Sequence, residues 1–282
     1  LIAIIISILI FYNQIINLSL PLIKENIQKK LNLLDNEKTT FNIKTDFKNN
    51  IIILKIKNPF FYNDKYISEG YADSIIGVDV TQAMLDKVDK SGNANIELIN
   101  ADTGSVELPE NHFDLATAYT FLDHLYEMLP TFANCYRSLR DGGLFYADLS
   151  PNAYFWDDIR ELNVHTSYDS IVNREVLAVH KKNEEIEAEF GVDKDLFTLA
   201  EYQKHVVGGL REELVEKQLQ QVGFKNITFI YHWFIGQAQL INDTSMSKEK
   251  RFDHASVMHE YLTKSLPVSR NLFKYIGFIA EK

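Results

Sequence analysis

The feature that most constrains the fold is a regular alternation that begins near residue 51. Short runs of β-branched and apolar residues alternate with amphipathic stretches whose apolar positions recur at helical spacing. This alternation is typical of βαβ units built around a parallel sheet. The first five strands predicted from it are Ile51–Ile56, Ser74–Val80, Ile96–Ile99, 112–121 and 144–150.

The second half of the chain continues this pattern after an interruption. The stretch 174–193 alternates apolar and polar residues on either side of "KKNEE", which predicts an antiparallel β-hairpin inserted outside the main sheet. Two further strands then follow the amphipathic helix at 210–224. The helices and strands predicted outside the hairpin are helices 81–92, Leu122–Leu139, 210–224 and Ala255–Lys264 and strands 225–234 and 273–282.

The first quarter of the chain has a different composition. All 12 glycines lie at or after Gly70, and Ala3 is the one alanine before it. The earlier segment is rich in Ile, Asn and Lys, which is what AT-rich DNA encodes whether or not it is coding. Two interpretations stay open, an evolved module and a segment wrongly joined to the domain.

Residues 1–23 are apolar and uncharged, and about 20 such residues span a bilayer. Lysines follow at Lys24, Lys29 and Lys30, so an anchor here would leave the rest of the chain in the cytoplasm. The alternatives are a single-pass membrane anchor and a buried or artefactual helix. Residues 24–50 then form a linker and 51–282 the main domain, with 151–205 as an inserted lid that contacts the substrate.

Charge and cysteine content exclude several classes of function. A formal net charge of −10 argues against nucleic-acid binding, because such binding depends on neutralising phosphates. Cys135 is the single cysteine, so the chain has no internal disulfide and no thiolate metal cluster, and its histidines lack metal-ligand spacing. We therefore expect a cytoplasmic protein without a metal that acts on a small molecule, with no clear oligomer interface in the sequence.

Five stretches carry a more specific signal because they occur in a fixed order. They are "IIGVDVTQAML" (75–85), "INADTGSVELPENHFDLATAYTFLDHL" (99–125), "CYRSLRDGGLFYADLS" (135–150), "LVEKQLQQVGFKNITFIY" (214–231) and "YIGFIAEK" (275–282). In these stretches the chain resembles the class I S-adenosylmethionine-dependent methyltransferases, especially their small-molecule branch. The resemblance implies a Rossmann-like, doubly wound, mostly parallel sheet of seven strands with an antiparallel last strand. It also implies S-adenosylmethionine as cofactor and methyl transfer to a small-molecule O, N or C acceptor.

Ligands of such sheets bind at the carboxyl ends of the strands, where Asp79 could accept both ribose hydroxyls. The resemblance gives Asp79 this role, and it places an acid that faces the adenine amino group at Asp102. Each role has an alternative. Asp79 could be a solvated acid at the end of a strand, Met84 could simply pack in the core, and Asp102 could simply belong to a turn at "ADTGS". The full predicted cofactor set is Asp79, Val80, Met84, Asp102, Thr103, Ala118 and Tyr119.

Candidate catalytic and substrate residues follow the fourth and fifth strands. His124 is a candidate general base because an imidazole titrates near neutral pH, although the family often uses His here for packing. The Tyr119 ring could form a wall beside the methyl group. The predicted aromatic residues of the lid are Tyr154, Phe155 and Trp156. The alternative is that these three side chains pack in the core.

The first loop of the domain departs from the family. An acid and a glycine-rich turn normally follow the first strand, and glycines there let the backbone approach the cofactor. In this chain the same place holds Lys57 and Pro59, followed by the aromatic run 60–62. We therefore expect weakened cofactor binding. Two rival hypotheses are an inactive methyltransferase-fold protein that binds a partner and a nicotinamide-dependent Rossmann enzyme.

Overall fold

The computed structural model describes residues 52–54, 74–88, 95–180, 184, 187–188, 191 and 193–282, the first three by their backbone only. The predicted hydrophobic segment 1–23, the linker 24–50 and the loop at 57–62 lie outside the described residues. In the described part of the chain, no helix is long and apolar enough to cross a membrane.

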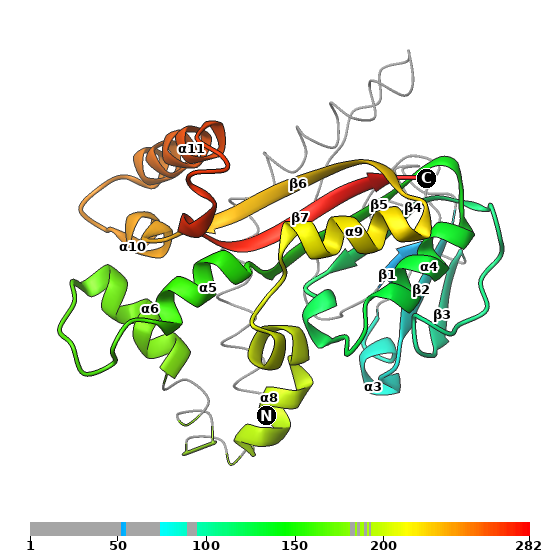
Figure 1. Cartoon of the computed structure of the whole chain (residues 1–282), viewed down its shortest axis with the longest axis horizontal. Coiled ribbons are helices and arrows are strands. Elements are labelled where there is room, and N and C mark those ends of the chain that lie inside the picture. The colour runs from blue at the N-terminus through cyan, green and yellow to red at the C-terminus, as the bar shows by residue number, and fades with distance from the viewer. Residues whose placement is uncertain are drawn as a thin grey trace.

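One mixed sheet organises the described residues (Figure 1). Its seven strands lie in the order β3-β2-β1-β4-β5-β7-β6. Strands β2 to β6 share one direction, and β7 is antiparallel to both of its neighbours. The predicted α/β class and antiparallel last strand are therefore confirmed. The strand bounds are β1 Ile52–Leu54, β2 Ile75–Asp79, β3 Ile96–Asn100, β4 Phe113–Tyr119, β5 Leu139–Pro151, β6 Lys225–Phe234 and β7 Phe273–Glu281.

The first strand differs from the expected arrangement in its direction. Strand β1 lies between β2 and β4 but is antiparallel to both, with Leu54 opposite Ile76 and Ala116. Its carboxyl end therefore lies at the edge of the sheet where β2 and β4 begin, opposite to the edge where they end. The expectation of a parallel first strand is wrong for these residues, because an apolar run fills the centre of a sheet in either direction.

Helices connect and flank the strands, and their bounds correct two predictions. The predicted helix Leu122–Leu139 is divided into a 3₁₀ turn and an α-helix, because Pro130 lacks an N–H and favours the first turn of a new helix. The predicted helix at 81–92 is one turn, α3, in the described residues. The bounds are α3 Gln82–Leu85, η1 Leu122–His124, α4 Leu129–Ser138, α5 Ala153–Arg160, α6 Ser170–His180, α8 Lys194–Ala200, η2 Gln203–Val207, α9 Glu212–Val222, α10 Gln237–Asn242, α11 Lys248–Lys264 and η3 Arg270–Leu272.

The predicted β-hairpin is wrong in its first arm, which is helix α6. Val172, Val176 and Val179 recur at helical spacing and pack on one apolar cluster with Phe155 and Trp156. The alternating pattern in the sequence counted Val176 and Ala178 on one face, but in the helix Val176 is buried and Ala178 is exposed. Contact with α5 therefore selected the helix, and the β-hairpin lid has no support in the described residues.

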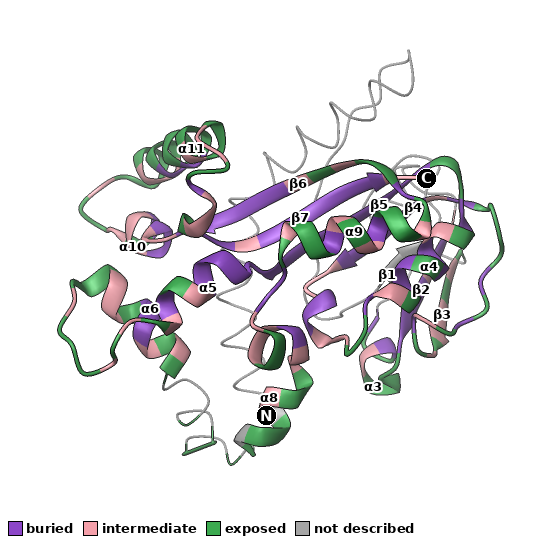
Figure 2. Ribbon diagram, in the orientation of Figure 1, coloured by how far each residue is buried: buried purple, intermediate pink, exposed green. Residues whose placement is uncertain are grey.

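The main core lies between the sheet and the adjacent pair α4 and α9 (Figure 1). Its centre is aromatic: the rings of Phe132, Phe145 and Phe278 are fully or almost fully buried and meet edge to face at 5.2 to 5.8 Å. Edge-to-face contact is a favoured geometry for aromatic rings. Figure 2 shows the central strands buried, while the outer faces of α9 and α11 are exposed.

Candidate active site

Asp79 ends β2, at the edge of the sheet where ligands of such folds bind. Its carboxylate is buried, and Oδ1 accepts a hydrogen bond of 2.6 Å from the Thr81 amide. Burial raises the pKa of Asp79, and the Thr81 hydrogen bonds oppose the rise. A buried carboxylate oriented by one amide can still accept bonds from hydroxyl groups of a ligand.

The next strand brings the second predicted acid to the same edge. Asn100, the last residue of β3, is opposite Asp79 and donates from its side chain to the Asp79 carbonyl at 3.0 Å. Asp102 is exposed two residues further on, and its Oδ1 accepts from the Gly104 amide at 2.9 Å. Asp102 therefore helps to form the turn that the sequence offered as an alternative, and it remains accessible to a ligand.

Thr103 and Met84 are embedded more deeply than Asp102. Thr103 is buried, its hydroxyl lies 2.9 Å from that of Thr131, and its carbonyl accepts from Asn134. Met84 is half-buried on α3. The neighbouring Val80 is exposed after the end of β2.

The fourth strand ends level with the second. Ile53 of β1 is opposite Gly77 on one side and Thr117 on the other, so Asp79 and Tyr119 each lie two residues beyond the same point. Ala118 is fully buried and Tyr119 is half-buried. The structure therefore brings the ends of β2 and β4 to one edge, separated by the width of β1.

His124 lies in the η1 turn after β4, and its charge acts in a minor way to lower the pKa of Asp79. Its Nδ1 donates to the Ala200 carbonyl at 2.7 Å, and its Nε2 lies 3.9 Å from the Asp123 carboxylate. Burial acts to lower the pKa of His124, but the Asp123 carboxylate and the Ala200 carbonyl outweigh it, and the pKa is raised. A raised pKa increases the protonated fraction near neutral pH, which works against a general base.

The three predicted lid aromatics lie in the interior on α5. Phe155 and Trp156 meet edge to face, and the Trp156 Nε1 donates to the Lys274 carbonyl at 3.2 Å. The Tyr154 hydroxyl hydrogen-bonds to Glu213, and the Arg270 guanidinium lies 3.7 Å from the centre of its ring. These contacts face α6, α9 and β7, on the other side of the sheet's midpoint from Asp79. They agree with the alternative of core packing.

Sequence reasoning missed a buried polar cluster beside Tyr119. Asp148 of β5 is opposite Tyr119, and its carboxylate lies 3.1 Å from His232 Nε2, with both side chains fully buried. The Tyr146 hydroxyl and the Leu149 amide also donate to this carboxylate. The Asp148 carboxylate packs closely on Gly277 of the intervening strand β7, where a Cβ would lie 2.6 Å from its Oδ1. An acid inside "LFYADLS" was the signal that could have found the cluster.

Two other polar residues near the site were also missed. Gln203 begins the η2 turn and donates to the Leu125 carbonyl just after η1, whereas Glu201 precedes η2 and contacts Lys204 and His205 within it. No sequence spacing relates them to η1, since 76 residues separate Ala200 from His124. Within the described residues, no group of three or more His, Cys, Asp or Glu side chains could hold a metal ion.

The family comparison agrees with this geometry. Residues 63–147 match the model of the methyltransferase domain family, a stretch that contains β2, β3, β4 and most of β5. This part of the chain is therefore similar to a methyltransferase domain. The match begins beyond Lys57 and Pro59. No curated protein matches the chain.

Several solved structures are similar to this chain, each with a low TM-score. One is a SAM-dependent methyltransferase from Archaeoglobus fulgidus, 18% identical over 78% of this chain and 80% of that chain, with a TM-score of 0.41. Another, from Mesorhizobium loti, is 16% identical over 77% and 84%, with a TM-score of 0.44. Phosphoethanolamine N-methyltransferase 2 from Haemonchus contortus is 15% identical over 77% of this chain and 45% of its own length, with a TM-score of 0.42. Scores this low give no information about the acceptor.

The predicted cofactor is S-adenosylmethionine, and the residues expected to hold it lie at the ends of β2 and β4. Asp79 has the placement and the exposed neighbours that a ribose acceptor needs, and Tyr119 lies level with it. On β1 the fit is poor, because the strand ends at the opposite edge. The site is therefore supported from β2 and β4 but not from β1.

Proposed function

We propose that the chain transfers the methyl group of S-adenosylmethionine to a small-molecule acceptor with an oxygen, nitrogen or carbon nucleophile. The observation that carries this proposal is the buried Asp79 carboxylate at the end of β2, level with Tyr119 at the end of β4. An acid at this place suits the ribose of a nucleoside cofactor. Asp102, at the same edge, suits the adenine.

The cofactor supplies an activated methyl group when it binds, so the protein has to orient the reactants and exclude water. In this proposal Ala118 and Tyr119 offer backbone carbonyls to a bound ammonium group, and the Tyr119 ring lines the methyl position. Val80, Met84 and Thr103 contribute packing or a backbone amide around the nucleoside. The base role of His124 stays a prediction, and its raised pKa favours a role in placement instead.

We further propose that cofactor affinity is reduced in this chain. Lys57 stands where the family has an acid, and Pro59 and Phe60 stand where it has glycines. A lysine cannot accept bonds from an ammonium group, and residues with a Cβ disfavour the positive φ angles that such a loop uses. The antiparallel direction of β1 adds to this argument.

The test is calorimetric titration of the full chain with S-adenosylmethionine and with S-adenosylhomocysteine. We expect binding in the high-micromolar range or weaker, reduced about tenfold by Asp79→Asn because hydrogen bonds to a charged acceptor are the stronger kind. Asp114→Asn, which changes an acid near the start of β4 at the opposite edge of the sheet, is the matched control and leaves affinity unchanged. Low-micromolar binding by the wild type contradicts the reduced affinity, and absence of binding at millimolar concentration contradicts the function.

A second candidate is a methyltransferase-fold protein that does not catalyse and binds a partner. The antiparallel β1 favours it, since the edge used by the cofactor then lacks the loop after the first strand. The same titration separates the two candidates. For the domain organisation, we propose 51–282 as the catalytic unit with 151–205 as its substrate-side insertion, and a role for 1–23 at a membrane.

A further inference from the structure

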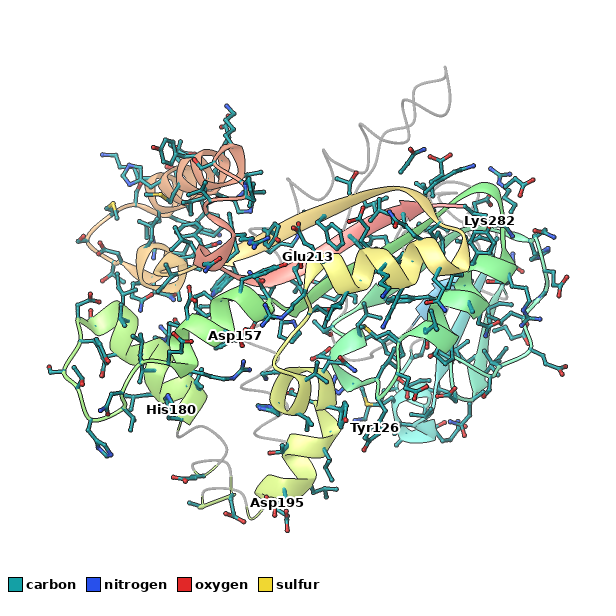
Figure 3. The ribbon with its side chains drawn as sticks, in the orientation of Figure 1. Tyr126, Asp157, His180, Asp195, Glu213 and Lys282 are labelled. Carbon is teal, nitrogen blue, oxygen red and sulfur yellow. The ribbon has the colours of Figure 1, made fainter. Side chains whose placement is uncertain are left out.

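Residues at the end of the insertion form hydrogen bonds with the turn that follows β4. We call residues 200–208 the cap segment. It lies between α8 and α9 in the chain and contains the π-helical turn η2. Single π-helical turns are rare and occur often at functional sites. In the view of Figure 1, α3 lies below the end of β2, and α8 lies further to the left at the bottom of the picture. Figure 3 labels Tyr126 between the cap segment and α3.

Gln203 makes the central contact between the cap segment and this turn. Its side chain is buried, and its Nε2 donates to the carbonyls of Leu125 at 2.8 Å and Tyr126 at 3.1 Å. The ring of Tyr202, the preceding residue, packs on Tyr126 with centres 4.7 Å apart. One amide group therefore holds two consecutive backbone carbonyls of the segment that leaves η1.

The other contacts around Gln203 hold the cap segment as a unit. Arg160 of α5 donates to the carbonyls of Lys204 at 3.1 Å and Gly208 at 3.1 Å. The Glu201 carboxylate accepts from the Lys204 ammonium and lies 2.9 Å from His205 Nε2. With its own backbone fixed in this way, the cap segment is a firm support for the side chain of Gln203.

The turn held by Gln203 follows the end of β4, where Tyr119 lies. His124 is part of this turn, precedes Leu125 and donates to the Ala200 carbonyl of the cap segment. A shift of Leu125 and Tyr126 would therefore move His124 relative to the end of β4. The contact is long-range in sequence, as 78 residues separate Gln203 from Leu125.

We infer that Gln203 is a positioning residue for the methyltransferase reaction, which holds the η1 turn, and through it His124, against the nucleoside edge of the site. The inference rests on the proposed function. Gln203 reaches the cofactor through backbone carbonyls and touches no reacting atom. Loosening the contact between the cap segment and η1 therefore lowers cofactor affinity.

The test compares Gln203→Met with the wild type in the full chain, since methionine keeps the volume and removes both donated hydrogen bonds. The control Gln220→Met makes the same change on the exposed face of α9. We expect Gln203→Met to weaken S-adenosylhomocysteine binding about tenfold, the effect of losing two hydrogen bonds of ordinary strength. Hydrogen exchange should also show that the ligand protects 122–126 and 200–208 in the wild type and much less in the variant.

Three outcomes decide the matter. A variant that binds S-adenosylhomocysteine as tightly as the wild type, with equal protection of the cap segment, overturns the inference and leaves the proposed function standing. Failure of the wild type to bind overturns the proposed function and the inference together. Weaker binding with a circular-dichroism spectrum and unfolding midpoint like those of Gln220→Met supports it, since a fold defect would move these two readouts as well.

Discussion

The two halves of the sheet differ in strand length and in the extent of their buried core. On the side of β5, β7 and β6, strands of 13, 9 and 10 residues carry aromatic side chains into a core covered by α4 and α9. On the side of β2 and β3, both strands have 5 residues, β3 has no fully buried position, and α3 is a single turn. The candidate cofactor acids lie on the thin side and the deeply buried polar cluster on the thick side.

This difference separates stability from ligand binding. Regions with few buried apolar contacts open at lower free energy, and binding loops are drawn from them. We therefore expect substitutions on the thick side to lower the free energy of unfolding, and substitutions on the thin side to change ligand binding with little effect on stability.

The largest effect should come from Asp148→Ala. This change removes the acceptor of the buried Tyr146 hydroxyl and the buried Leu149 amide, and each donor left unsatisfied costs about 1 to 3 kcal/mol. Urea unfolding followed by circular dichroism measures the loss. Asp114→Ala, which breaks an ion pair with the largely exposed Arg140, should cost about 1 kcal/mol or less. Equal losses in the two variants would remove the distinction between the buried cluster and the surface.

Gly277→Ala should have the next largest effect. A Cβ at 277 would lie 2.6 Å from the Ala147 carbonyl and from the Asp148 carboxylate, inside a sheet that cannot move apart. Overpacking of this kind costs about 1 to 3 kcal/mol. Gly142→Ala has open space and a φ of 77°, so it should cost about 1 kcal/mol through backbone strain alone. Thermal unfolding of both variants provides the comparison, and a milder effect at 277 than at 142 would contradict it.

Lowering the pH should decrease the free energy of unfolding because His259 is buried on the thick side. This side chain donates to the Tyr231 carbonyl, and burial together with His232 lowers its pKa to about 4. Because the folded pKa lies below the unfolded value of 6.5, the contribution is complete above pH 6.5 and is lost as the pH falls toward 4. Between pH 7 and pH 5 the wild type should lose about 2 kcal/mol more than His259→Gln.

Urea unfolding at the two pH values measures that difference. His254→Gln alters an exposed histidine of the same helix and should behave like the wild type. If the wild type and His259→Gln lose the same amount, the buried histidine has no part in the acid response.

The smallest effect on stability is expected at the cofactor acid. Asp79→Asn keeps an oxygen for the Thr81 amide and removes a charge that burial disfavours, so the free energy of unfolding should change by about 1 kcal/mol or less. Cofactor affinity should fall in the same variant. A loss of stability as large as that of Asp148→Ala would mean that Asp79 is a structural residue, and the contrast between the two sides would fail.

The sequence by itself determined the elements that depend on local patterns. The β-branched runs gave β2, β4, β6 and β7 within a few residues, and the stripe through Val215 and Leu219 gave α9. It also placed Asp79 and Tyr119 at strand ends, because parallel strands present their carboxyl ends at one edge. These features need only the period of the chain and its turn residues.

Tertiary structure decided the features that depend on distant neighbours. The direction of β1 follows from pairing with β2 and β4, and α6 is a helix because Val176 packs against α5. The contact between His232 and Asp148 spans the intervening strand β7, where the carboxylate packs closely on Gly277. Gln203 meets Leu125 only when the insertion folds back. None of these pairings leaves a periodic signal, since each joins residues far apart in the chain.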